Sequence, residues 1–252
     1  MPQSLASDPA IAPDVALRVD LAAALRLAVR FDLHEGIDNH FTVRVDAHRF
    51  LVNRYGLHWS EITASNLSLV DGRTGHVVGG GEAERVAYHI HWPVYRSRPD
   101  VRCVLHTHMP YATALCLIDR GRLEMADQVA LRFHGRIAYD DEYPGPVGTQ
   151  GEAEGDRLAR TLGDKPILFM RSHGVLVAAA SVAHAFDDLY YLERCARKQW
   201  LAAHYGRPLA AIAPEVADAA GDWFGTSFDV YKETHFAALR RVLDRDEPDY
   251  RQ

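Results

Sequence analysis

The chain has 252 residues, 48% of them hydrophobic, and its 34 acidic against 28 basic residues give a formal net charge of −6. This length suits one substantial core, and the acidic balance without basic, aromatic-rich runs argues against nucleic acid as a partner. No apolar run approaches the roughly 18 residues needed to span a bilayer, so no membrane partner is expected. The three cysteines lack disulfide or metal spacing, and the first residues lack a signal-peptide pattern. We therefore expect a soluble, cytoplasmic protein with reduced thiols.

The predicted elements begin after a Pro/Ala/Ser-rich segment, 1–14, that we expect to be disordered. From Asp14, Leu, Ala and Val recur at three- and four-residue spacing, which predicts an amphipathic helix. Alternating or continuous short apolar runs predict strands at 39–45, 49–53, 66–70, 76–78, 101–109, 136–139, 166–170 and 175–180. Helical spacing with caps and stop signals predicts helices at 82–97, 110–118, 150–162, 181–204 and 227–243.

This order of elements predicts an α/β fold. Strands paired as hairpins, alternating with helices, indicate one α/β/α layered domain with a central, mainly antiparallel sheet. No internal repeat or linker divides the chain. We assign the domain to residues 15–210 and treat residues 211–252 as a helical extension of the same domain.

The segment Val101–Met109 (VRCVLHTHM) combines a buried strand with a His-x-His pair at its end. Side chains two residues apart on a strand point the same way, so His106 and His108 project side by side, about 6–7 Å apart at the backbone. Two imidazoles in this arrangement suit a divalent metal. The alternative is a pair of ordinary histidines, one satisfied by the core and one by water.

A third histidine occupies a matching context. In PILFMRSHGVLV (166–177), His173 lies just before a glycine, in a sharp corner between two buried runs. Together with His106 and His108 it completes a set of three neutral ligands, which leaves a divalent metal its full charge. Such a site keeps coordination positions open for a substrate and acts as a Lewis acid.

Several motifs together resemble the class II aldolase/adducin family. They are SRPDVRCVLHTH (97–108), HTHMPYATAL (106–115), FMRSHGVLV (169–177), VAHAFDDLYYLERC (182–195) and GIDNHFTVRV (36–45). The resemblance covers about residues 15–210. It implies one divalent ion per subunit on His106, His108 and His173. Zinc is the first expectation for this ion, and iron, manganese and cobalt are alternatives. Aldolases of this family cleave sugar phosphates through an enediolate and are typically homotetramers with the active site at the subunit boundary.

The sequence departs from the aldolase pattern at the acid/base position. The resemblance places a glutamate one turn before the helix histidine that corresponds to His91, and that position here is Ala87. Glu84 is therefore our candidate for the catalytic acid/base and Glu82 a candidate substrate contact. The alternative is a solvated helix N-terminus, where the helix dipole favours acidic residues.

A second departure concerns the phosphate pocket of the aldolases. Bulky residues at 39–42 (NHFT) stand where the aldolases have a small Gly-Asn-x-Ser loop, and 55–59 (YGLHW) replaces a Thr-Gly-x-x-Lys-like anchor. We therefore expect a non-phosphorylated substrate. The segments GEAERVAYHIH (81–91) and LRFHGRIAYDDEYPG (131–145) are nearer to the adducin-like branch. That branch includes decarboxylases of hydroxylated acids, iron-dependent oxygenases of aromatic acids and adducin heads without catalysis.

Four further residues are candidates for substrate chemistry. Asn39 and His40, at a strand start, are predicted to hydrogen-bond the substrate, although an edge histidine satisfied by its neighbours is the alternative for His40. Arg132 is a candidate for binding a substrate carboxylate, with a solvent-exposed strand residue as the alternative. Tyr139 is a candidate proton donor across a subunit interface, with a core or turn tyrosine as the alternative.

Three functions remain open at this point. The leading hypothesis is a divalent-metal-dependent lyase that decarboxylates, or cleaves by a retro-aldol step, a small non-phosphorylated hydroxy or oxo acid through a metal-stabilised enolate. The first alternative is a non-haem iron oxygenase acting on an aromatic or hydroxy acid with the same three histidines. The second is a non-catalytic, adducin-like interaction module, although adducins carry a long basic tail and this chain ends in LDRDEPDYRQ. The expected partners are a small-molecule substrate and further copies of the chain in a homotetramer.

Overall fold

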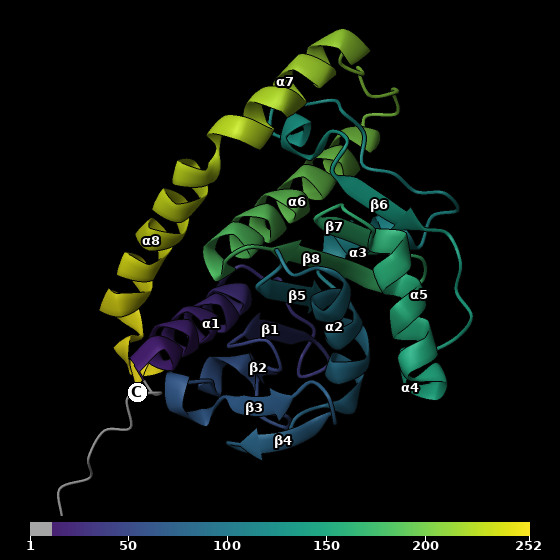
Figure 1. Cartoon of the computed structure of the whole chain (residues 1–252). Coiled ribbons are helices and arrows are strands. Elements are labelled where there is room, and N and C mark those ends of the chain that lie inside the picture. Colours follow the sequence, from purple (N-terminus) through teal and green to yellow (C-terminus); the bar gives the residue numbers. More distant parts are fainter. Residues whose placement is uncertain (1–11) are drawn as a thin grey trace, which may run out of the picture.

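The computed structural model describes residues 12–252 (Figure 1). Of the stretch 1–14 predicted to be disordered, residues 1–11 lie outside the described part. Residues 12–14 correct that prediction, because they form the first turn of α1 (Ala12–Arg30). Asp14 accepts a hydrogen bond from Arg18 one turn later at 2.9 Å, and the pair stabilises this turn.

The strands of the described residues form one sheet of eight. They are β1 (His40–Arg44), β2 (Arg49–Val52), β3 (Ser68–Asp71), β4 (His76–Gly79), β5 (Cys103–Thr107), β6 (Ile137–Asp140), β7 (Ile167–Met170) and β8 (Gly174–Ala179). Their order in the sheet is β4-β3-β2-β1-β5-β8-β7-β6. Every neighbouring pair is antiparallel except β6 with β7, which is parallel. The prediction of a mainly antiparallel sheet in an α/β domain is confirmed.

Helices cover both faces of this sheet. They are α2 (Arg85–Ser97), α3 (Pro110–Cys116), α4 (Val147–Gln150), α5 (Glu152–Leu162), α6 (Val182–Ala203), α7 (Pro214–Ser227) and α8 (Asp229–Asp246). Helices α1, α3 and α6 bury their apolar residues against one face, and α2 and α5 against the other (Figure 1). Strand β5 shows how the sequence divides between the faces, since Cys103 and Leu105 join the first core and Val104 the second. None of the helices in residues 12–252 combines the length and apolarity that crossing a membrane requires.

The structure corrects the predicted helix boundaries at two places. The helix expected over 150–162 is divided into α4 and α5 at Gly151, whose φ of +61° ends the first segment. The terminal helix expected over 227–243 corresponds to α8, and a further helix, α7, precedes it and meets it at Phe228. Pro214, at the first position of α7, starts this additional helix in the Ala-rich part of the predicted helical extension.

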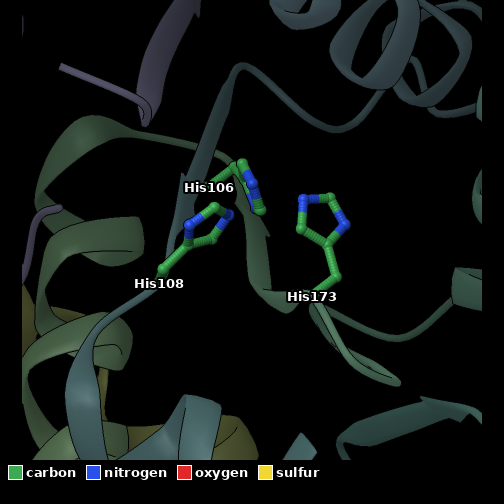
Figure 2. Close-up of side chains that lie close together, drawn as sticks. All are labelled: His106, His108 and His173. Carbon is green, nitrogen blue, oxygen red and sulfur yellow. The ribbon is translucent and has the colours of Figure 1, made fainter. Parts of the chain in front are cut away.

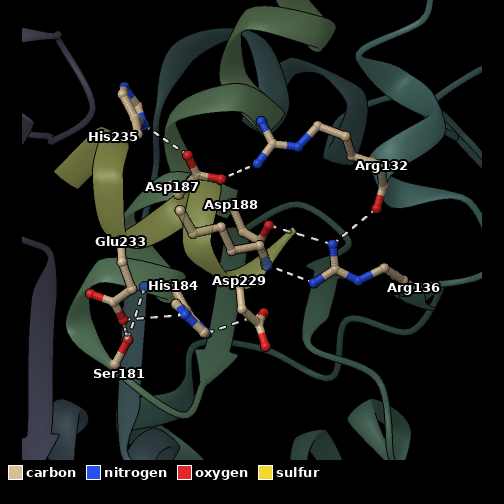
Figure 3. A network of polar contacts seen from close by, with 10 residues as sticks. Arg132, Arg136, Ser181, His184, Asp187, Asp188, Asp229, Glu233 and His235 are labelled. Carbon is tan, nitrogen blue, oxygen red and sulfur yellow. Dashed lines mark hydrogen bonds and ion pairs between the residues drawn. The ribbon is translucent and has the colours of Figure 1, made fainter. Parts of the chain in front are cut away.

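Buried charges fasten the C-terminal helices to the domain. Figure 1 shows α7 and α8 along the outer side of α6, with α8 reaching α1. Asp188 on α6 is fully buried and accepts hydrogen bonds from Arg136 at 2.7 Å and from Lys232 of α8 at 3.1 Å (Figure 3). Although burial opposes its charge, these two cations hold the pKa of Asp188 below its usual value. This ion cluster joins α8 to α6 and to the segment that carries Arg136.

Candidate metal centre

The candidate centre lies at one end of the central strands of the sheet, where β5 ends and β1 and β8 begin. We call this end of the strands the sheet edge. His40 pairs with His106 across β1 and β5, and Thr107 pairs with Val175 across β5 and β8. Residues paired across antiparallel strands share a face, so His40 and His106 both point to the face that α2 covers. The strand register therefore sets the histidines of two strands beside each other.

The turn between β7 and β8 brings in the third predicted histidine. Residues 171–173 connect the paired ends Met170 and Gly174, and Ser172 adopts a left-handed conformation with φ of +54°. Gly174 is required by close packing, because a Cβ at this position would lie 2.7 Å from both the His108 ring and the Thr107 carbonyl oxygen. The absence of a side chain at residue 174 lets His108 and the turn approach each other.

The three predicted ligands lie together (Figure 2). One side-chain nitrogen from each of His106, His108 and His173 falls within 4.8 Å of the other two. The ring centroids are 5.0 Å apart for His106 and His108, 4.7 Å for His106 and His173, and 5.1 Å for His108 and His173. Among the described residues, this is the group of three or more His, Cys, Asp or Glu side chains that could hold a metal ion.

Hydrogen bonds fix the orientation of two of these rings. His106 Nδ1 donates to the Val175 carbonyl oxygen at 2.9 Å, and His108 Nδ1 donates to the Glu35 carboxylate at 2.6 Å. A nitrogen that donates carries the proton, so Nε2 of each neutral ring keeps its lone pair. His108 Nε2 is buried and has no hydrogen-bond partner. Both rings thus offer a free lone pair to the centre.

Burial favours the neutral form of two of the three rings. It lowers the pKa of His173 to about 4, with a smaller contribution from His108. Burial also lowers the pKa of His106 well below its usual value, and the neighbouring histidines add to this shift. Neutral imidazoles are the form that binds a metal, and one nitrogen of each ring lies within 4.8 Å of one nitrogen of each of the other two. The donor set fits a divalent ion.

His40 extends the site into a buried chain of polar groups. Its Nδ1 lies 2.8 Å from His91 Nε2, and Thr42 Oγ1 lies 2.7 Å from both His91 Nδ1 and the Tyr95 hydroxyl. The His40 ring is 4.8 Å from that of His106. Burial is the main cause that lowers the pKa of His40 well below its usual value, and it lowers the pKa of His91 to about 3. The chain holds the neutral His40 ring in place beside the three histidines.

Asn39, a predicted substrate contact, is fully buried at the same edge. Its Oδ1 accepts the backbone N–H groups of Glu35 at 2.8 Å and His108 at 3.3 Å. Its Nδ2 is buried without a hydrogen-bond partner. The amide therefore fixes the backbone around the centre and retains one unused donor.

The two candidate carboxylates lie at the start of α2 and are not members of the three-histidine group. Glu84 is the N-cap residue, and burial together with nearby Asp38 raises the pKa of its carboxyl. Glu82 lines an open groove with Arg54, and its carbonyl oxygen accepts hydrogen bonds from neighbouring residues. Ala87 is buried in the core between α2 and the sheet. The catalytic role of Glu84 and the substrate role of Glu82 stay predictions.

Arg132 is placed in the packing of the C-terminal helices. It is buried in a short 3₁₀ helix and pairs with Asp187, which also accepts a 2.7 Å hydrogen bond from His235 of α8 (Figure 3). Its guanidinium lies 4.1 Å from the Tyr191 ring centre and 4.7 Å from that of Phe228. This placement corrects the alternative of an exposed strand residue. Because the ion pair and the two aromatic rings already contact the guanidinium, Arg132 is not one of the proposed substrate contacts.

Tyr139 lies on the edge strand β6. Its hydroxyl accepts the Leu123 backbone N–H at 3.1 Å, and the Arg122 guanidinium lies 4.2 Å from its ring centre. Burial raises the pKa of the phenol. The hydroxyl keeps its own proton available to donate, and the role of Tyr139 as a proton donor across a subunit interface stays a prediction.

Sequence reasoning missed three residues around the centre. The sequence gives no role to Glu35, and Thr42 and Tyr95 fall within the strand predicted over 39–45 and the helix predicted over 82–97 without a polar role. The alternation of His40 and Thr42 on one strand face could have indicated a shared polar partner. Glu35 carried no such signal, since a loop carboxylate reaches His108 only through the tertiary fold.

Comparisons with known proteins agree with this architecture. The model of the "Class II Aldolase and Adducin N-terminal domain" family matches residues 19–200. An adducin-related protein of Schizosaccharomyces pombe is 35% identical over 94% of this chain and 77% of its own length. The crystal structure of an aldolase II superfamily protein from Pseudomonas syringae is 34% identical, covers 98% of both chains and has a TM-score of 0.86. An L-fuculose 1-phosphate aldolase from Glaciozyma antarctica shares the fold, with a TM-score of 0.81 at 24% identity over 100% of this chain and 97% of its own. The chain belongs to the class II aldolase and adducin family.

Proposed function

We propose that this chain is a divalent-metal-dependent lyase that acts on a carbon–carbon bond of a small, non-phosphorylated hydroxy or oxo acid. The observation that carries the proposal is the convergence of three neutral imidazoles, His106, His108 and His173, at one edge of the sheet. Class II aldolases are typically dependent on a divalent metal, and membership of this superfamily supports a lyase-type function. The reaction would be decarboxylation or retro-aldol cleavage.

The three histidines would hold the ion, with zinc as the first expectation and iron, manganese or cobalt as alternatives. When bound there, a divalent ion supplies Lewis-acid stabilisation of negative charge that develops on a substrate oxygen. The neutral donor set supports this role, because it leaves the charge of the ion uncompensated by its direct ligands. A homotetramer completes the proposal, as the family resemblance implies.

His40 and Asn39 would bind and orient the substrate. The His40 ring is fixed by His91 on one side and lies beside the His106 ring on the other. Asn39 holds the backbone of His108 through Oδ1 and has its Nδ2 donor unused. A buried, unpaired amide donor costs free energy unless a partner satisfies it, and a substrate oxygen is such a partner.

Decarboxylation suits the residues better than aldol cleavage does. Carbon dioxide leaves without prior removal of a proton, so the reaction depends less on a carboxylate base. Ala87 occupies the position where the family resemblance implies that base, and Glu84, which precedes Ala87 at the start of the same helix, is the candidate to replace it. The raised pKa of the Glu84 carboxyl suits a group that returns a proton to the product carbanion.

The proposal is tested by anaerobic turnover of a panel of hydroxy and oxo acids with protein reconstituted with zinc, manganese or cobalt. We expect release of carbon dioxide or of an aldehyde fragment from at least one acid, and loss of at least 100-fold in kcat/KM in His106→Ala. His48→Ala is the matched control, because His48 is exposed in the β1–β2 hairpin. Activity that persists in His106→Ala would contradict the proposal.

The resemblance to the adducin-related protein supports a second candidate, a non-catalytic interaction module. This candidate predicts no turnover of any acid and no functional effect of His106→Ala. Turnover that requires both iron and oxygen would instead assign the same histidines to an oxygenase, and oxygen uptake measured with the same panel separates that outcome from the lyase.

A further inference from the structure

We propose that Glu35 is a positioning residue that fixes His108 as a metal ligand and strengthens its binding. The inference rests on the metal site of the proposed function and names a residue, outside the three histidines, that tunes it. Glu35 acts through His108, since its carboxylate contacts the histidine ring and is not a member of the group of metal-ligating atoms.

The contact has the geometry of a strong hydrogen bond. Glu35 Oε2 lies 2.6 Å from His108 Nδ1, which is short for a bond between nitrogen and oxygen. A carboxylate only accepts, so the proton resides on Nδ1 and the lone pair on Nε2. The opposite nitrogen, His108 Nε2, is buried and has no hydrogen-bond partner. The carboxylate therefore selects the tautomer in which the buried nitrogen can bind a metal.

The three histidines differ in what supports them. His106 donates Nδ1–H to the neutral carbonyl of Val175, whereas His108 donates to a carboxylate. His173 lies on a turn without a comparable side-chain bond among the described contacts. An ionised acceptor draws the Nδ1 proton more strongly than a carbonyl does and leaves more electron density at Nε2. His108 is thus the ring of the three that a carboxylate orients.

The loop that carries Glu35 is built to hold this contact. The Asn39 Oδ1 atom accepts the backbone N–H of Glu35 at 2.8 Å and that of His108 at 3.3 Å. The Asp38 N–H donates to the Glu35 carbonyl oxygen at 3.0 Å, and Gly36 supplies the positive φ of +56° that this tight turn requires. One buried amide therefore ties together the two backbones whose side chains meet.

The negative charge of Glu35 also acts on the ion itself. Three uncharged imidazole ligands leave the charge of a divalent ion uncompensated. The Glu35 carboxylate, which contacts one of these ligands, would offset part of that charge. The Glu35 side chain is 63% exposed, so salt in the solvent screens this part of the effect. Metal affinity should therefore depend on ionic strength through Glu35.

The test is the zinc dissociation constant of the full chain, measured by competition with a chromogenic chelator at low and high salt. We expect Glu35→Ala to weaken zinc binding by roughly 10- to 100-fold and Glu35→Gln, which keeps an acceptor but loses the charge, by roughly 10-fold. The loss in Glu35→Gln should shrink as salt is raised. Asp38→Asn is the matched control, because it removes an equal charge from an exposed residue of the same loop and should change affinity less than 2-fold.

Two spectroscopic readouts separate positioning from a general structural effect. Long-range ¹⁵N NMR of histidine-labelled protein should show His108 as the Nδ1–H tautomer in the wild type and a mixture of tautomers in Glu35→Ala. The absorption spectrum of the cobalt-loaded protein should keep its intensity in Glu35→Gln. A change to a different coordination number would mean that Glu35 is itself a ligand, and would overturn the proposal.

The remaining outcomes are distinguishable from failure of the metal site. If the wild type takes up no metal, the site of the proposed function fails, and this inference fails with it. If the wild type binds zinc and both Glu35 variants bind it within 2-fold, only the role of Glu35 is refuted. Thermal melts of each variant without metal show whether a weaker affinity reflects loss of folding.

Discussion

The surroundings of the three predicted ligands prepare their rings to bind a metal. Nδ1 of His106 and of His108 is committed to an acceptor, and burial lowers the pKa of both His106 and His173. Deeper in the molecule, His91 is fully buried between His40 and Thr42. Acid protonates such a histidine in the unfolded chain before it protonates the buried ring in the folded chain. The free energy of unfolding therefore falls in acid.

We predict that His91 makes the metal-free protein sensitive to acid. The unfolded chain protonates a histidine near pH 6.5, whereas burial lowers the pKa of His91 to about 3 in the folded chain. Between these values the unfolded state binds more protons, so the free energy of unfolding falls as the pH falls. At pH 4.5 this contribution is about 2–3 kcal/mol. Urea unfolding with EDTA at pH 7 and pH 4.5 measures it.

The comparison variant for this experiment is His91→Gln. Its stability should change less between the two pH values than that of the wild type, by about 2 kcal/mol. An equal pH dependence in both proteins would contradict the assignment of His91 as a buried neutral base.

At the scale of elements, the turn between β7 and β8 decides whether the third histidine reaches the other two. Ser172 takes the left-handed conformation, and Gly174 allows the His108 ring to approach the start of β8. The short strand ends on either side are paired at Met170 and Gly174, so the turn has little freedom to adjust. Space at this turn is therefore a requirement of the site.

We predict that Gly174→Ala disrupts the centre. The added Cβ would lie 2.7 Å from the His108 ring and from the Thr107 carbonyl oxygen, so the ring or the strand must move. We expect a loss of about 1–3 kcal/mol in stability and weaker metal binding. Thermal melts and zinc titration measure both effects.

Gly225→Ala is the control for that substitution. Gly225 lies within α7 with open space around its Cβ position, so alanine should be neutral or slightly stabilising there. If Gly174→Ala bound zinc and melted like the wild type, the packing argument at the turn would be wrong.

At the scale of the whole molecule, buried ion pairs join segments that are far apart in the sequence. Asp187 of α6 is fully buried and contacts both Arg132 and His235 of α8. Neighbouring Asp188 contacts Arg136 and Lys232. Removing one partner of such a cluster leaves an uncompensated buried charge.

We predict that Asp187→Ala destabilises the protein by about 3–5 kcal/mol, because it leaves the buried Arg132 without its counter-ion. Asp229→Ala is the control, since the Asp229 side chain is 77% exposed and lies 3.8 Å from His184. That substitution should cost less than about 1 kcal/mol. Chemical unfolding measures both, and a loss below 1 kcal/mol for Asp187→Ala would contradict the account of this cluster.

The sequence alone predicted the layers, the strands and the three candidate ligands, because these depend on local periodicity and on side chains with distinct chemistry. It did not predict the ion cluster of Asp187 and Asp188. A mid-helix pair of acidic residues reads as a solvated face until the packing of α8 is known. Arg132 was misread for the same reason, since its partners come from α6 and from the C-terminal helices that the sequence described least well.

The site itself was predictable to the extent that its residues lie at strand ends. His106 and His108 follow from alternation on one strand, and His173 from a polar residue in a corner between two buried runs. The contacts that prepare these rings depend on loops and strand register. Glu35 reaches His108, and Thr42 reaches His91, only across the assembled sheet edge.

The central claim is that His106, His108 and His173 form a divalent-metal site. Elemental analysis of protein purified without chelators tests it most directly, with His173→Ala and the exposed-site control His48→Ala analysed alongside. The account predicts close to one divalent ion per chain in the wild type and in His48→Ala, and almost none in His173→Ala. Wild-type protein that contains no metal and takes up none on reconstitution would contradict it.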